Sequence, residues 1–359
     1  MSTSTKPPEL EEDQGNVLAR MQKVQGAQIL LLLIAVVALF TILEPGSFLT
    51  VSNIRTVVVN TSILAVLGVG MTFVIITGGI DLSVGSVLVF SGVVASKTMS
   101  AMGGQGWGVA IVGIIVACLS GLAWGLLNGF LVAKAKVPAL IVTLGTLGMA
   151  LGLAQIITSG VDIREVPDVL GNSIGYGRIG GQLPILVVIA AVIVLIGIVV
   201  LHRTKFGLHT YGVGSNEEGC RRVGISVDRH LIGVYGISGL LAGVAGILSL
   251  SYFQSTTLSG QTTTNLNVIA GVVIGGTSLF GGVGSIFGTI MGLFVPTILQ
   301  NGFVIIGIQP FWQQVVVGIV LIGAVYVDQQ RRADANRGGT GTGLLGKLLS
   351  RRLSSKEGV

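Results

Sequence analysis

Asp81 is the only acidic residue in the apolar part of the chain between Glu44 and Asp162, and it stands in the run TGGIDLSVGS at residues 77–86. A carboxylate at the centre of a lipid bilayer costs on the order of 2.5–3.5 kcal/mol on insertion scales, so it must face protein, water or a helix end. Asp81 and Ser83 lie where one apolar segment ends and the next begins. They could therefore cap a helix by accepting hydrogen bonds from its first amides, or line a passage for a solute.

Neutral hydrogen-bonding side chains recur inside the other apolar segments. Such groups suit the passage of a neutral polar solute, although most polar groups at this depth bond between helices. An ion-coupled carrier usually holds several ionisable groups within its spans, so proton coupling is not expected here. With Asp81 and Ser83, the candidate pathway residues are Asn60, Thr72, Asn128, Thr143, Thr146, Asn265 and Asn267.

Several other kinds of chemistry lack the residues they need. Residues 341–347 resemble the start of a phosphate-binding loop, but Leu348 follows where Ser or Thr is required. Cys118, Cys220 and the three histidines show no metal-ligand spacing. The net charge of +6 is spread beside apolar segments rather than gathered on one basic face, which argues against nucleic-acid binding. We expect no catalytic residue, metal or cofactor in this chain.

The composition predicts that these residues are positioned by membrane-spanning helices. Residues 230–327 contain no Asp, Glu, Lys or Arg, and the chain is 51% apolar with a mean hydropathy of +0.87. A span needs about 20 mainly apolar residues, and the 56 glycines suit close helix packing. We therefore predict an all-α polytopic helix bundle of about ten transmembrane helices, near 27–43, 54–78, 81–99, 107–131, 137–159, 184–201, 231–253, 266–280, 284–303 and 311–327.

The distribution of positive charge predicts the orientation of the bundle. With the N-terminus inside, seventeen Lys and Arg residues fall on the cytoplasmic side and four outside. Both termini are then cytoplasmic, with a tail at residues 1–26, a transmembrane domain at 27–327 and a second tail at 328–359. The leucines and cations of the second tail suit either a lipid surface or solvent.

Two glycine-rich breaks carry related sequences. Gly78 and Gly79 precede VGS at residues 84–86, and Gly275 and Gly276 precede VGS at residues 283–285. If the second to fifth helices correspond to the seventh to tenth, the two sets start on opposite sides of the membrane. Such an inverted repeat is common in transporters, and coincidence in a glycine-rich chain is the alternative.

Two loops are long enough to bind partners. The outer loop at residues 160–183 is polar and turn-rich, so it is a candidate docking surface. In the inner loop at residues 202–230, Ser215 and Glu218 have capping-box spacing, and Gly224 can end the helix that they begin. This short cytoplasmic helix would carry Ser215, Asn216, Glu217, Glu218, Arg221 and Arg222.

Four parts of the chain carry long motifs: GMTFVIITGGIDLSVGSV at 70–87, GLLNGFLVAKAKVPALIVTLGT at 125–146, RTKFGLHTYGVGSNEEGCRRVGI at 203–225, and VVIGGTSLFGGVGS at 272–285 followed by PFWQQVVVGIV at 310–320. These stretches resemble the ribose-type sugar permeases, the membrane subunits of bacterial ABC importers for monosaccharides. The resemblance covers about residues 50–330 and is specific, because several long motifs occur in order.

The resemblance implies a multi-pass subunit of the bacterial cytoplasmic (inner) membrane with several partners. They are a cytoplasmic ABC ATPase that holds ATP and Mg, an extracytoplasmic sugar-binding protein, a second permease copy or paralogue, and membrane lipid. The helix at residues 215–222 would be the coupling element in a groove of the ATPase. Asn265 and Asn267 stand where the family often has acidic residues, which leaves a charge role there in doubt.

Three other functions are alternatives to that of a permease subunit that moves a monosaccharide inward by alternating access, driven by a separate ATPase. The nearest is a sister importer permease for branched-chain amino acids, nucleosides or a furanose signal molecule. A secondary transporter would work without an ATPase partner. A membrane-embedded enzyme would need converging catalytic groups, which a lone Asp81 does not supply.

Overall fold

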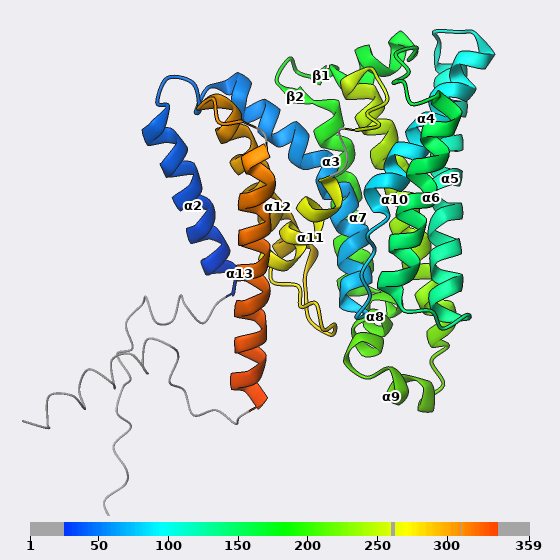
Figure 1. Cartoon of the computed structure of the whole chain (residues 1–359), viewed down its shortest axis with the longest axis vertical. Coiled ribbons are helices and arrows are strands. Elements are labelled where there is room, and N and C mark those ends of the chain that lie inside the picture. Colours follow the sequence, from blue (N-terminus) through cyan, green and yellow to red (C-terminus); the bar gives the residue numbers. More distant parts are fainter. Residues whose placement is uncertain (1–24, 260–262, 310, 337–359) are drawn as a thin grey trace, which may run out of the picture.

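The computed structural model describes residues 25–259, 263–309 and 311–336. The predicted N-terminal tail and residues 337–359 of the second tail lie outside these ranges. A helix overlaps each predicted span: α2 (Gln25–Leu43), α3 (Val51–Ile76), α4 (Val84–Met102), α5 (Trp107–Ala133), α6 (Ala139–Thr158), α7 (Ile185–Arg203), α10 (Val227–Phe253), α11 (Thr264–Ile274), α12 (Ile286–Ile305) and α13 (Phe311–Asn336). The prediction of an all-α polytopic bundle is confirmed (Figure 1).

The number of full spans is smaller than predicted. Within the described residues, seven helices are long and apolar enough to cross a membrane, whereas α2, α11 and α13 offer shorter apolar stretches. The prediction of a span at 266–280 was wrong, because α11 has 11 residues and ends at Ile274. Gly276 then adopts a φ of +88°, which an L side chain rarely tolerates, and the chain leaves the helix. At the other end, α13 continues past residue 327 to Asn336.

The helices α5 and α10 pack with their backbones in direct contact. A Cβ atom on Gly125 would overlap the carbonyl oxygen of Tyr235, and one on Gly239 would overlap the carbonyl oxygen of Gly121. Small residues let transmembrane helices approach until their backbones touch, which strengthens dispersion contacts where lipid supplies no hydrophobic driving force. We call this contact the glycine seam.

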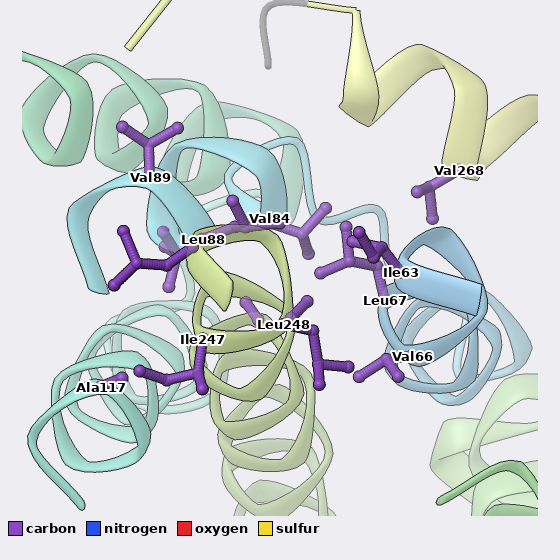
Figure 2. Packing of buried hydrophobic residues seen from close by; sticks show 14 of the residues in the cluster. Ile63, Val66, Leu67, Val84, Leu88, Val89, Ala117, Ile247, Leu248 and Val268 are labelled. Carbon is purple, nitrogen blue, oxygen red and sulfur yellow. The ribbon is translucent and has the colours of Figure 1, made fainter. Parts of the chain in front are cut away.

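The apolar core lies between α3, α4, α5 and α10. Figure 2 shows Leu67 of α3, Val84 and Leu88 of α4 and Leu248 of α10 in one cluster of side chains, and all four are almost fully buried. Outward-facing positions are apolar too, as on α6 and α7, where Ile141 (61% exposed) and other large aliphatic side chains face away from the bundle. Such surfaces are stable next to lipid or another apolar helix.

The two glycine-rich breaks lie side by side. The amide of Gly282 donates to the carbonyl oxygen of Ile76 at 2.8 Å, which joins the α11–α12 connection to the end of α3. In an inverted repeat the axis lies in the membrane plane, and the broken helices of the two halves can meet near the midplane. The repeat of helices 2–5 and 7–10 stays a prediction.

The outer loop is ordered by its contacts with the connection after α10. It contains a short π-helix (Leu170–Gly175) and the antiparallel pair β1 (Arg178–Ile179) and β2 (Leu183–Pro184). Asp162 accepts hydrogen bonds from the Thr256 hydroxyl at 3.1 Å and the Leu258 amide at 2.9 Å.

The glycine seam gives a test of the fold. Gly125→Ala should lower the stability of the detergent-solubilised protein by about 1–3 kcal/mol, because the added methyl group forces the two backbones apart. Gly148→Ala on α6 is the matched control, since a Cβ there meets no atom within 4 Å. Thermal unfolding measures both. Equal unfolding temperatures for the two variants would contradict the packing described here.

Candidate translocation pathway and coupling site

Asp81 is the centre of a buried hydrogen-bond network at the break between α3 and α4. Its Oδ1 accepts from the Ser83 amide at 2.9 Å and the Ser83 hydroxyl at 2.6 Å, and its Oδ2 accepts from the Ser238 hydroxyl at 3.1 Å. Asn128 of α5 donates to the same Ser83 hydroxyl at 2.9 Å. All four residues are at most 1% exposed. The network therefore ties α4, α5 and α10 together.

The first turn of α4 is capped by one nearby residue, Asp81, and one distant residue, Asn265, rather than by Ser83. Ser83 precedes the helix but makes no side-chain cap hydrogen bond. Asp81 satisfies the Ser83 amide, and Asn265 of α11 accepts from the Gly85 amide at 2.6 Å. This geometry supports the capping interpretation of Asp81, and a pathway role for it stays a prediction.

Two buried oxygens next to this network have no hydrogen-bond partner among the described residues. They are Oδ1 of Asn128 and the hydroxyl of Tyr235, which lies against the backbone of Gly79. An unpaired buried polar group costs about 1–3 kcal/mol. Both oxygens are available to pair with groups that a helix movement brings within reach.

The other threonines proposed for the pathway bond within or between helices. The Thr72 and Thr289 hydroxyls lie 2.7 Å apart and join α3 to α12. Thr143 donates to the carbonyl oxygens of Ala139 and Ile80, and Thr146 donates to that of Thr143. The structure does not bring these residues together with Asn60 or Asn267 in one site.

Asn60, Asn265 and Asn267 line two cavities on either side of the first turn of α11. One cavity of about 260 Å³ is bounded by α3, α10, α11 and α12 and contains Asn60 and Asn267 in its wall. The other, of about 220 Å³, lies between α4, α6 and α11 and contains Asn265. We call the first the outer cavity, because it lies next to the ends of α10 and α12 and the start of α11, on the side of the outer loop (Figure 1).

The inner loop forms two helices where one was predicted. They are α8 (Lys205–Ser215) and α9 (Glu217–Arg222), at the lower end of the bundle in Figure 1. The predicted capping role of Ser215 was wrong. Ser215 ends α8, and Asn216 caps α9 by accepting from the Gly219 amide at 2.8 Å. The predicted end of α9 is confirmed, since Gly224 has a φ of +84° just beyond it.

A cluster of charges joins α9 to α5 and α10. Arg221 donates to Glu217 at 2.8 Å and to Asp228, in the first turn of α10, at 2.6 Å. Lys134 and Lys136, which follow α5, bind the same Asp228 carboxylate at 3.1 and 3.2 Å. Hydrogen bonds from Arg221 to Asp228 and Glu217 raise the pKa of the guanidinium further above its ordinary value, so it stays charged.

The sequence did not predict the roles of Asp228, Lys134 and Lys136. The sequence shows that these three residues are charged and lie near predicted helix ends. It does not show that the packing of α5 against α10 brings Lys134 and Lys136 to Asp228. On the other side of α9, Arg222 and Glu218 form an exposed pair at 3.4 Å. Isolated exposed pairs contribute little to stability, so these side chains are available to a partner.

Contacts of α8 reach both glycine-rich breaks. A Cβ on Gly214 would overlap the carbonyl oxygen of Ile76 at the end of α3. The Tyr211 hydroxyl donates to the carbonyl oxygen of Gly284 at 2.8 Å, in the connection from α11 to α12. Displacing α8 would therefore act on α3 and on the α11–α12 connection together.

These features define a multi-pass membrane transport subunit. Seven of the described helices are long and apolar enough to cross a membrane, and the interior of the bundle is almost uncharged. The described residues contain no cluster of His, Cys, Asp and Glu that could hold a metal. The chain belongs to the family of branched-chain amino acid transport system permease components, which matches residues 53–325.

Its relatives include sugar permeases. The chain is 36% identical to the ribose import permease of Escherichia coli K12 over 305 residues, which is 84% of this chain and 93% of that protein. It is 37% identical to the ribose import permease of Bacillus subtilis 168 over 308 residues, 84% of this chain and 92% of the relative. The D-allose transport permease of Escherichia coli K12 is 33% identical over 298 residues, 83% of this chain and 90% of the relative. No solved structure matches.

Membership of this family confirms the resemblance seen in the four sequence stretches. The chain is a non-catalytic, multi-pass subunit of an ABC importer in the inner membrane. An importer of this class also includes an ATPase and a binding protein. The secondary transporter and the membrane enzyme are therefore not favoured.

The Asp81 network gives a second test. Asp81→Leu leaves three donor groups without an acceptor, namely the Ser83 amide and the hydroxyls of Ser83 and Ser238. Each unpaired donor costs about 1–3 kcal/mol, so the variant should express poorly and unfold at lower temperature. Asp81→Asn keeps one acceptor oxygen and should fall between this variant and the wild type. Normal expression, stability and transport of both variants would show that the network is dispensable.

Proposed function

We propose that this chain forms the membrane conduit of an ATP-driven importer for a monosaccharide or a related neutral polyol. The observation that carries the proposal is the link between an exposed charged helix, α9, and the helices that surround an uncharged polar cavity. The names of the ribose and allose permeases among its relatives support the same class of substrate.

The proposed coupling surface consists of Ser215, Asn216, Glu217, Glu218, Arg221 and Arg222. Glu217, Glu218 and Arg222 have side chains 52%, 68% and 77% exposed, so a groove on an ATPase can reach them. In this arrangement α8 and α9 are cytoplasmic and both termini lie on the same side. The excess of Lys and Arg in the inner segments supports that orientation.

The proposed partners bind at opposite ends of the bundle. The ATPase binds α9, and the binding protein docks on the outer loop at residues 160–183. A second copy of the permease, or a paralogue, packs against an apolar outer face in the lipid. ATP-driven movement of α9 passes through Arg221 and Asp228 to α10, and through α8 to α3 and the α11–α12 connection.

This movement would switch the bundle between outward-facing and inward-facing states without covalent chemistry on this chain. The helices that this movement would displace are α3, α10, α11 and α12, and these four helices also bound the outer cavity. The proposed pathway residues are Asn60, Thr72, Asp81, Ser83, Asn128, Thr143, Thr146, Asn265 and Asn267. Among them, Asn60 and Asn267 face the outer cavity, while the buried threonines and Asp81 hold its helices in place.

The proposal predicts ATP-dependent uptake by vesicles that contain this chain, its ATPase and its binding protein. Accumulation of radiolabelled ribose or allose should stop on addition of vanadate, and an uncoupler that dissipates the proton gradient should leave it unchanged. Vesicles with this chain alone should accumulate nothing. Uptake against a gradient by the purified chain without a second polypeptide would overturn the proposal.

Charge reversal on α9 tests the coupling surface. Glu217→Lys with Glu218→Lys places two lysines beside Arg221 and Arg222, so stimulated ATP hydrolysis by the reconstituted complex should fall to its unstimulated rate. The bundle should still fold, because both side chains are exposed and lie outside the core. Glu44→Lys, between α2 and α3 at the other end of the bundle, is the matched charge-reversal control. Normal coupled uptake by the double variant would count against the assignment.

A further inference from the structure

Neutral hydrogen-bonding side chains from α3, α11 and α12 form much of the wall of the outer cavity, together with Thr263, which precedes α11. The cavity volume of about 260 Å³ equals the liquid volume of about nine water molecules, which is the size range of a monosaccharide with part of its hydration shell. The polar lining residues are Asn60, Thr263, Thr264, Asn267, Thr297 and Gln300.

The chemistry of this wall matches hydroxyl groups. A side-chain amide offers two donors and a carbonyl acceptor, and a threonine hydroxyl both donates and accepts. A sugar hydroxyl also does both, so the amides of Asn60 and Asn267 can pair with it in either direction, whereas the Thr297 hydroxyl already donates to the Leu293 carbonyl oxygen at 2.9 Å. Asn60 and Asn267 are half-buried, which places their amides partly out of competition with bulk water.

Among the described residues, no charged side chain lines the outer cavity. Its lining residues are all neutral, and residues 230–327, which supply α11 and α12, contain no Asp, Glu, Lys or Arg. A free amino acid would bring an ammonium and a carboxylate into this space without partners, and burying an unpaired charge is costly. The wall therefore favours an uncharged polyol over a zwitterion, although the family is named for branched-chain amino acids.

An apolar side completes the cavity. Ile63 and Leu64 of α3 and Phe253 at the end of α10 also line it. Apolar surface with a few converging polar groups is the usual composition of a small-molecule site. The apolar side chains suit the C–H face of a sugar ring while the amides contact its hydroxyls.

The position of Asn267 connects this cavity to the Asp81 break. Residues two apart on a helix point about 200° apart, so Asn265 and Asn267 lie on opposite faces of the first turn of α11. Asn265 caps α4 at 2.6 Å from the Gly85 amide, while Asn267 faces the outer cavity. A ligand that holds Asn267 therefore acts on the turn that also caps α4.

We infer that the outer cavity is a binding site for a neutral monosaccharide within the permease itself, with Asn60 and Asn267 as its selective contacts. The inference rests on the proposed function and adds to it a site that discriminates by charge. Selectivity then resides in this chain as well as in the binding protein.

Saturation-transfer NMR on the solubilised complex of permease and ATPase, without binding protein, tests the site directly. D-Ribose and D-allose are the probes, and L-leucine and the anionic polyol gluconate are the charged comparisons. The wild type should transfer saturation to at least one of the two sugars and to neither charged compound. A wild-type complex that binds neither sugar, or binds leucine or gluconate in preference, would overturn the site.

Amino-acid substitutions then test whether the sugar that receives saturation is bound in the outer cavity. Asn60→Leu and Asn267→Leu should each weaken sugar binding by about tenfold, the effect of one or two lost hydrogen bonds. Gln155→Leu makes the same kind of change on an exposed position of α6 and should bind as the wild type does. Unchanged binding by both cavity variants would overturn the site. ATP-driven sugar uptake in vesicles would in that case still support the proposed function, whereas wild-type vesicles without sugar uptake would overturn both.

Discussion

A helix that ends inside a bilayer leaves backbone amides and carbonyls that lipid cannot satisfy, and this constraint accounts for most of the polar interior. At the α3–α4 break, Asp81 and Asn265 accept from the first amides, and Gly282 donates to the exposed carbonyl of Ile76. At the α11–α12 break, Ser285 caps α12. Asn265 and Gly282 reach the α3–α4 break from distant segments, so this break helps to hold the bundle together, whereas Ser285 caps α12 locally.

Hydropathy and the residues typical of helix ends predicted the features that depend on residues close together in the sequence. The positions of the helices, the short α9 and its end at Gly224 follow from local composition and backbone preference. The features that were missed depend on contacts between distant segments. Asn216 rather than Ser215 caps α9, because α8 continues to Ser215, and Thr72 pairs with Thr289 across two helices. Nothing in the local sequence marks Ser238 as the partner of Asp81.

The proposed coupling surface and the outer cavity lie at different levels of the bundle but share helices. Asp228 begins α10 and Phe253 ends it, so one helix joins the charge cluster to the cavity wall. The carboxylate of Asp228 holds three cations at once, which is a stronger attachment than an isolated exposed pair. In the proposed function, the neutral side chains of the outer cavity recognise the solute and the charged side chains at the end of the bundle transmit the movement of the ATPase.

The glycine seam restricts how this protein can change shape. Along Gly121, Gly125 and Gly239 the two backbones touch directly, so no side chain remains between them that could switch rotamer or be compressed. Sliding α5 along α10 would drive carbonyl oxygens into Cα atoms at every turn. The pair then moves as one rigid body, and bending falls to connections outside it, such as the α3–α4 break at Gly78 and the connection after α11, where Gly276, Gly281 and Gly282 have positive φ angles.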